Sequence, residues 1–310
     1  MSSFRFLPDD TNIGFMKYAK LASYISAAAC VASVILFFAV GLNFGIDFKG
    51  GTLIEIQTKQ KADIGALRSK IGSLGLGDFE LQSFGSDKDV LIRFETQEGG
   101  EKNQRIAVEK VQKALGGEVD FRRIEVVGPK VSGKLAQEGT IAVIVAILAV
   151  MVYIWFRFEW QFAVGAVLSL SHDVLLTIGI FAILQISFGL PIIAAILTIV
   201  GYSLNDTVVV YDRVRENLRK YKKKSLQDVI DLSLNQMLRR TILTSVSTLL
   251  ALFALYAFGG EVLRGFTFTM IWGVIIGTYS SIFIAAPLLM FTGARISEPV
   301  KPEGEGEASV

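Results

Sequence analysis

The chain has 310 residues, of which 52% are hydrophobic and only 19% are charged, and its mean hydropathy is +0.50. This composition is too apolar for an ordinary soluble globular protein, and it predicts a membrane protein. Because 31 Lys and Arg nearly balance 29 Asp and Glu, the charge gives no reason to expect a nucleic-acid-binding surface.

Six apolar segments are long enough to cross a hydrocarbon core of about 30 Å. They are residues 21–42, 139–156, 162–184, 190–210, 241–258 and 266–291. We therefore expect a polytopic protein with six transmembrane helices, which occupy residues 21–42 and, together with their connections, residues 139–292. The first helix would serve as an uncleaved signal anchor.

Residues 43–138, between the first and second apolar segments, alternate apolar and polar side chains and are punctuated by Gly and charge. Such a pattern is typical of a folded, water-exposed domain. Its elements predict the βαββαβ order of a ferredoxin-like α+β domain. The expected strands are 52–57, 79–83, 90–95 and 120–127, and the expected helices are 62–74 and 102–115.

Lys and Arg in the short connections predict the orientation, because cytoplasmic loops are rich in these residues. If both termini are cytoplasmic, fifteen Lys and Arg fall in inside segments and only Arg264 falls in a short outside loop. We therefore expect cytoplasmic ends at residues 1–20 and 293–310 and an extracytoplasmic domain at residues 43–138. The tail 293–310 is rich in Glu, Gly and Pro and is predicted to be disordered.

Residues 213–240 form a basic cytoplasmic segment between the fourth and fifth apolar segments. Ser225 followed by Asp228 is a capping box, which predicts the start of a helix. Apolar residues then recur at helical spacing. We interpret this stretch as an amphipathic helix along the inner membrane surface, whose basic residues attract anionic membrane lipid.

Ionisable side chains inside spanning helices are costly and usually have a partner or a function. His172 and Asp173 lie near the middle of the third apolar segment, Asp206 lies near the cytoplasmic end of the fourth, and Arg240 opens the fifth. Asp206 and Arg240 are within about one helical turn of the same depth, so an ion pair between them is geometrically reasonable. Asp173 lies about 9 Å deeper.

Further polar residues extend this group into a seam. They are Asn205, Thr241, Thr244, Ser245 and Thr248. The pattern fits a proton or cation relay, in which Asp206 gains and loses a proton beside Arg240, with His172 and Asp173 deeper in the path. A structural ion pair near the interface is the alternative that the residues leave open.

The spanning segments also contain a pair of glycines at helical spacing, and they lack the residue patterns of metal sites and catalytic sites. Gly273 and Gly277 form a Gly-x-x-x-Gly pair, which predicts close packing of the sixth helix. The apolar segments contain no His-rich metal site and no pairing of nucleophile and base. We therefore expect no metal, no cofactor and no enzymatic activity.

Two long motifs closely resemble the SecD/SecF family of bacterial protein-export membrane proteins, which belongs to the RND transporter superfamily. The motifs are Phe44-Gly45-Ile46-Asp47-Phe48-Lys49-Gly50-Gly51 and Gly201-Tyr202-Ser203-Leu204-Asn205-Asp206-Thr207-Val208-Val209-Val210-Tyr211-Asp212-Arg213. The first motif includes Gly45, Asp47, Phe48, Gly50 and Gly51, but it lacks the spacing of a nucleotide-binding loop, so we expect no nucleotide.

The resemblance implies an auxiliary export subunit in the bacterial cytoplasmic (inner) membrane. Such a subunit pairs with SecD, associates with the SecYEG translocon, and uses the proton gradient to act on unfolded polypeptide at the outer side. The resemblance also implies that Asp206 is the essential intramembrane carboxylate and that Arg240 is its partner. Three alternatives stay open: sodium as the coupling ion, half of an RND-type small-molecule or lipid transporter, and a purely structural interaction module.

Overall fold

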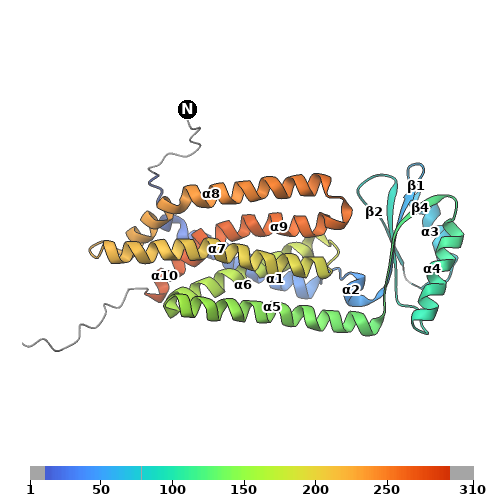
Figure 1. Ribbon diagram of the computed structural model, residues 1–310, viewed down its shortest axis with the longest axis horizontal. Helices are drawn as coiled ribbons and strands as arrows, with labels where there is room; N and C mark the ends of the chain where they lie inside the picture. The colour runs from blue at the N-terminus through green and yellow to red at the C-terminus, as the bar shows by residue number, and fades with distance from the viewer. Residues whose placement is uncertain (1–10, 78, 294–310) are drawn as a thin grey trace, which may run out of the picture.

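The computed structural model describes residues 11–77 and 79–293. Within them, six helices are long and apolar enough to cross a membrane. These helices form a bundle, and a small α+β domain lies beyond one end of it (Figure 1). The expected fold is therefore confirmed, whereas the predicted disordered tail lies outside the described residues apart from Gly293.

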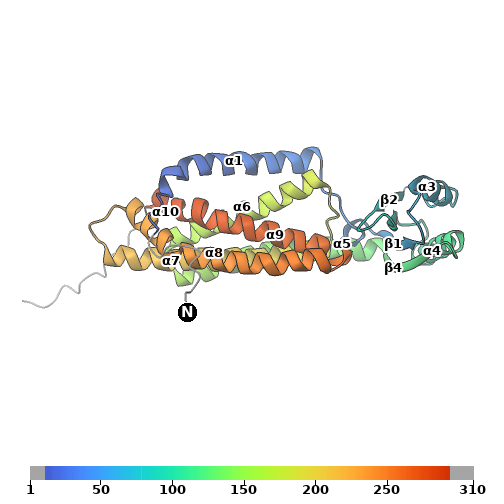
Figure 2. The same ribbon diagram turned by 90° about the horizontal axis from the view of Figure 1, so that it is seen from above.

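Three helices form the centre of the bundle and three lie around them. The central α6, α7 and α9 bury far more of their surface than α1, α5 and α8, which expose apolar side chains as lipid-facing helices do. Figure 2 shows α1 on one side of the bundle, where it packs mainly on α6. The bounds are α1 Met16–Ala39, α5 Pro129–Arg157, α6 Trp160–Leu184, α7 Leu190–Lys220, α8 Leu226–Phe258 and α9 Glu261–Ser280.

The last spanning helix changes its geometry near its end. After α9, residues Ser281–Ala285 form a π-helical turn, and α10 (Ala286–Thr292) continues the helix. One apolar segment of the sequence therefore corresponds to three successive pieces of helix.

The α+β domain has the expected βαββαβ order. Its sheet is antiparallel throughout and has the strand order β2-β3-β1-β4. Two helices, α3 and α4, cover one face of the sheet. On that face, alternate strand residues such as Ile54, Ile92 and Phe94 are buried against Ile71 of α3 and Val111 of α4. The bounds are β1 Gly51–Thr58, α3 Ile64–Gly72, β2 Phe79–Ser83, β3 Asp89–Phe94, α4 Glu101–Leu115 and β4 Val119–Val127.

Residues 213–240 differ from the separate surface helix that we expected. Ser225 does cap a helix, accepting a hydrogen bond from the Asp228 backbone N–H at 3.1 Å, but this helix is α8, which runs unbroken into the fifth spanning segment. Its apolar residues, including Ile230 and Leu234, are buried in a cluster with residues of α1 and α7. The helical pattern thus arises from packing between helices.

Candidate functional site

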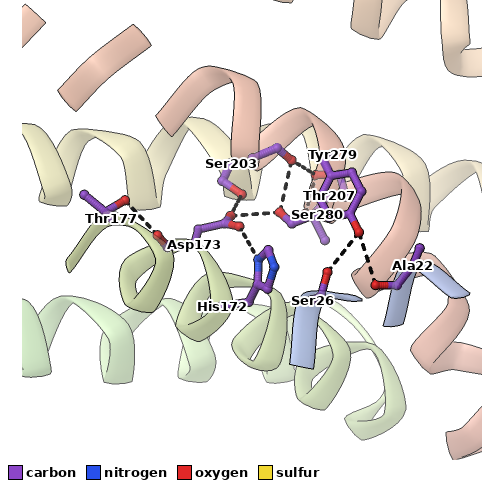
Figure 3. A network of polar contacts seen from close by, with 11 residues as sticks. Ala22, Ser26, His172, Asp173, Thr177, Ser203, Thr207, Tyr279 and Ser280 are labelled. Atoms are coloured by element: carbon purple, nitrogen blue, oxygen red, sulfur yellow. Dashed lines mark hydrogen bonds and ion pairs between the residues drawn. The ribbon is translucent and has the colours of Figure 1, made fainter. Parts of the chain in front are cut away.

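A carboxylate lies at the centre of the bundle, where α6, α7 and α9 meet (Figure 3). Asp173 of α6 is only 1% exposed. Its Oδ2 accepts hydrogen bonds from Ser203 Oγ of α7 at 2.7 Å and from Ser280 Oγ of α9 at 2.8 Å. Its Oδ1 lies 3.0 Å from Nδ1 of His172. Side chains of all three central helices therefore meet at this one carboxylate.

Small residues allow the helices to come this close. A Cβ at Gly277 of α9 would lie 3.0 Å from the Cβ of Ser203, and a Cβ at Gly273 would lie 2.2 Å from a side-chain carbon of Ile199. The predicted close packing of the Gly-x-x-x-Gly pair is therefore confirmed, and its partner is α7. Because α9 lies so near α7, Ser203 and Ser280 can share one oxygen of Asp173.

The π-helical turn begins directly after Ser280. Ser281 Oγ lies 2.9 Å from Thr207 Oγ1 of α7, and the Tyr211 hydroxyl donates to the Ala285 carbonyl at 3.1 Å. Single π-helical turns within α-helices occur frequently at functional sites. Here the turn places two successive hydroxyl residues against α6 and α7.

His172 links the carboxylate to the peripheral helix α1. Its ring packs against Tyr279 with a centroid distance of 6.1 Å. The Tyr279 hydroxyl lies 2.9 Å from Ser26 Oγ and donates to the Ala22 carbonyl at 3.2 Å. Within the described residues, His172 Nε2 is buried without a hydrogen-bond partner, and no Lys or Arg lies within ion-pair distance of Asp173.

Asp206 occupies a different face of α7 and is half-buried. Its Oδ1 accepts a hydrogen bond from Thr241 Oγ1 of α8 at 3.0 Å, and its Oδ2 has no hydrogen-bond partner in the described part of the chain. Arg240 is exposed and forms no ion pair with it there. The expected direct ion pair is not formed because successive helical residues point about 100° apart, and Thr241 is the one that faces α7.

The other residues of the predicted seam divide between two surfaces. Ser245 Oγ lies 2.7 Å from Thr278 Oγ1 of α9, and the Tyr202 hydroxyl of α7 donates to Thr248 at 3.4 Å. Asn205 and Thr244 are exposed on the outside of α7 and α8. The seam is therefore partly an internal contact of α8 and partly an exposed polar patch.

Asp173 and Asp206 do not contact each other, but α7 is involved in the hydrogen bonds of both. It carries Ser203, which donates to Asp173, and it carries Asp206 itself. Ser203, which binds Asp173, precedes Asp206 by three residues, which is slightly less than one helical turn. The motif from Gly45 to Gly51 lies apart from this network, at the end of the bundle next to the α+β domain (Figure 1).

Sequence reasoning missed the hydroxyl residues that hold Asp173. Ser203 and Thr207 lie at i and i+4 within the second motif, and Ser280 and Ser281 form a polar pair inside an apolar run. Both patterns are visible in the sequence. They show where hydroxyl groups lie along a helix, but they do not identify the helices that these groups contact.

Comparison with known proteins identifies the family. A family model described as "Protein export membrane protein SecD/SecF, C-terminal" matches residues 107–295, and one described as "SecD/SecF GG Motif" matches residues 35–62. The chain belongs to the SecD/SecF family. The protein translocase subunit SecF of Rickettsia akari is 45% identical over 302 residues, covering 96% of this chain and 97% of its own. SecF of Rhodobacter capsulatus is 46% identical over 304 residues, covering 93% and 91%.

A solved structure agrees with this assignment. The crystal structure of SecDF, a translocon-associated membrane protein from Thermus thermophilus, has a TM-score of 0.84 and 30% identity over 93% of this chain. SecDF in its super-membrane-facing form has a TM-score of 0.69. The chain spans 40% of the length of these SecDF chains. It is thus a multi-pass membrane transport protein of the SecD/SecF family and not an enzyme, similar over nearly its whole length to SecF subunits of the protein translocase.

Proposed function

We propose that this chain couples the proton gradient to a late stage of polypeptide translocation, as an auxiliary subunit beside the SecYEG translocon. The observation that carries the proposal is the buried Asp173, whose hydrogen bonds join α6, α7 and α9. Hydrogen bonds to an ionised carboxylate are about twice as strong as neutral ones. Protonation of Asp173 therefore weakens the contacts among three helices and biases the bundle towards another packing.

The relay consists of Asp206, Arg240, Asp173 and His172. Asp206 lies less than one turn beyond Ser203 on α7, so a proton on either carboxylate changes a contact of the same helix. Asp206 Oδ2, which has no hydrogen-bond partner among the described residues, is the oxygen available to take up the proton. Sodium is the alternative ion for the same carboxylates.

The exposed polar patch on α7 and α8 supports a partner in the membrane. Asn205, Arg240 and Thr244 are exposed on spanning helices of this chain, where contact with lipid would be costly. A second six-helix unit placed against this patch would cover them, as expected for one half of a pseudo-symmetric transporter. The SecDF neighbour supports SecD as that partner. With both termini in the cytoplasm, the α+β domain lies on the outer side of the membrane, where it meets polypeptide.

The test is an export assay in vesicles containing SecYEG, SecD and this chain. We expect Asp206→Asn, Asp173→Asn and Arg240→Ala each to reduce export to the level seen without a proton gradient. Asp212→Asn is the matched control, because Asp212 lies on the same helix in an exposed ion pair with Arg157 at 3.0 Å, and it should leave the gradient dependence unchanged. An Asp206→Asn protein that assembles and keeps full gradient dependence would falsify the relay.

The same vesicles identify the ion. With a proton gradient alone the native protein should be fully stimulated, and replacing it by a sodium gradient should remove the stimulation. The opposite result, stimulation by the sodium gradient alone, would show that the same carboxylates bind sodium instead of protons.

A further inference from the structure

The motif that follows α1 forms a joint between the bundle and the α+β domain. The segment after α1 pairs with the loop between α6 and α7, since Phe188 N donates to the Asn43 carbonyl at 2.7 Å and Gly45 N donates to the Phe188 carbonyl at 2.9 Å. The rings of Phe44 and Phe48 each lie about 6 Å from that of Phe188. The joint is thus held by backbone hydrogen bonds and an aromatic cluster.

Asp47 provides the cap that α7 lacks in its own sequence. The residue before the helix is Gly189, which has no side chain to satisfy the first N–H groups. Asp47, on the short helix α2 (Ile46–Lys49), accepts a hydrogen bond from the Leu190 N–H through Oδ2 at 2.9 Å. A Cβ at position 189 would lie 2.6 Å from the same oxygen, so the contact also requires glycine there.

The other end of the joint leads directly into the sheet. Gly50 has a φ of +74° and Gly51 a φ of +118°, and a Cβ at Gly51 would lie 2.5 Å from the Phe94 carbonyl of β3. Only glycine accepts both conditions without strain. Because β1 begins at Gly51, only three residues separate Asp47, the cap of α7, from a central strand of the sheet.

We infer that Asp47 is a positioning residue, which passes movement of α7 to the α+β domain. The inference rests on the proposed function, because it assigns the output of the relay. Asp206 lies sixteen residues beyond Leu190 on the same helix, about 24 Å along its axis. A continuous helix transmits axial displacement over this distance, and Asp47 joins its first turn to β1 through α2.

A cleft beside Asp47 leaves room for the domain to move. It has a volume of about 520 Å³ and lies between the sheet face that carries no helices and the ends of the spanning helices. Leu53, Leu91 and Glu55 line it from the strands, and Tyr256 and Phe266 line it from the bundle. Relative movement of the two parts would therefore open or close a space that already exists.

The experiment uses the full chain reconstituted with SecD and SecYEG and measures two quantities. The first is hydrogen–deuterium exchange of the Leu190 amide, and the second is the part of export that depends on the proton gradient. In Asp47→Ala we expect exchange to rise about fivefold to tenfold, the effect of losing one cap, and the gradient-dependent export to be lost. Asp47→Asn keeps an acceptor oxygen and should retain most of both.

Two further variants guard against a general loss of folding. Gly189→Ala displaces the Asp47 carboxylate without removing it and should reproduce the Asp47→Ala result. Asp63→Ala removes the same kind of cap from α3, where Asp63 accepts from the Ala66 N–H at 3.0 Å, and should leave gradient-dependent export intact. Unchanged exchange in Asp47→Ala, or faster exchange with full gradient dependence, overturns the inference.

Asp206→Asn measured alongside separates this inference from the proposed function. If Asp206→Asn abolishes gradient dependence and Asp47→Ala preserves it, the inferred role of Asp47 is overturned and the relay stands. If Asp206→Asn preserves gradient dependence and Asp47→Ala abolishes it, the relay is overturned and the role of the joint in export stands.

Discussion

Asp173 and Asp206 differ in how the protein satisfies their oxygens. Both oxygens of Asp173 have partners, and the side chain is held from three helices. Asp206 has one partner, Thr241, and its other oxygen has none within the described residues. The position of Asp173 is thus fixed by the fold, whereas Asp206 keeps an acceptor for a proton or for a group from a partner subunit.

Replacement of Ser280 by Ala should measure how strongly Asp173 is held. The variant loses a hydroxyl that donates to Asp173 Oδ2 at 2.8 Å, and we expect a loss of about 1–2 kcal/mol in the free energy of unfolding. Thermal unfolding of the purified protein in detergent provides the measurement. Ser247→Ala is the control, because Ser247 is exposed and donates to the Thr244 carbonyl of its own helix; equal effects would contradict the prediction.

The sequence predicted the ionisable residues of the site better than their partners. His172, Asp173 and Asp206 stand out because charge is rare in apolar segments. Ser203 and Ser280 do not, because hydroxyl residues are common in spanning helices, and their partners depend on the relative rotation of two helices. The expected direct contact between Asp206 and Arg240 is absent for the same reason, since similar depth does not determine which way a side chain points. Arg240 is nevertheless close enough for its charge to act on Asp206.

Among the elements, α7 and α9 pack closely against each other. Their contact is permitted by Gly273 and Gly277, which face Ile199 and Ser203. This contact places Ser280 beside Asp173. Packing of these two helices and assembly of the carboxylate site therefore depend on the same glycines.

Gly273→Ala tests this packing. The new Cβ would lie 2.2 Å from Ile199, and we expect such overpacking to cost about 1–3 kcal/mol. Adding Ile199→Ala should recover part of the loss, so a double-mutant cycle of unfolding midpoints should show a favourable coupling. Gly201→Ala is the control, because no neighbouring atom lies within 4 Å of its added Cβ; absence of coupling would refute the contact.

Element boundaries were predicted well in the α+β domain and less well in the bundle. Alternation and turn residues located each strand and helix of the domain within two residues of its observed ends. In the bundle, hydropathy detects only the part of a helix that is apolar. It therefore ended the fourth segment at Val210 and began the fifth at Thr241, although α7 continues to Lys220 and α8 begins at Leu226.

Across the whole molecule, side-chain contacts join the α+β domain to the end of the bundle. The joint at Asp47 is one contact, and Arg93 of β3 is another. Arg93 donates to Ser187 Oγ of the α6–α7 loop at 2.9 Å and to Asn43 Oδ1 at 3.3 Å. The order of the elements along the chain predicted where the domain is inserted, but not these contacts, because their partners are more than forty residues apart.

Loss of Arg93 should loosen the domain without unfolding it. Spin labels at Lys110 of α4 and Phe258 of α8, in a Cys30→Ser background, report the separation of the two parts. We expect Arg93→Ala to broaden the distance distribution, because two of the hydrogen bonds between them disappear. Arg105→Ala changes an exposed arginine of α4 and should leave the distribution as narrow as in the native protein, and identical distributions for the two variants would disprove the role of Arg93.

The π-helical turn Ser281–Ala285 gives the last helix one residue more than a regular α-helix would need over the same span. Deletion of one residue within the turn would let it close as an α-helical turn and would keep the residues that follow, such as Leu289, in their places in the core. The same deletion in the regular part of α9 would rotate every residue that follows by about 100°. The turn is therefore the part of this helix in which the loss of a residue disturbs the packing least.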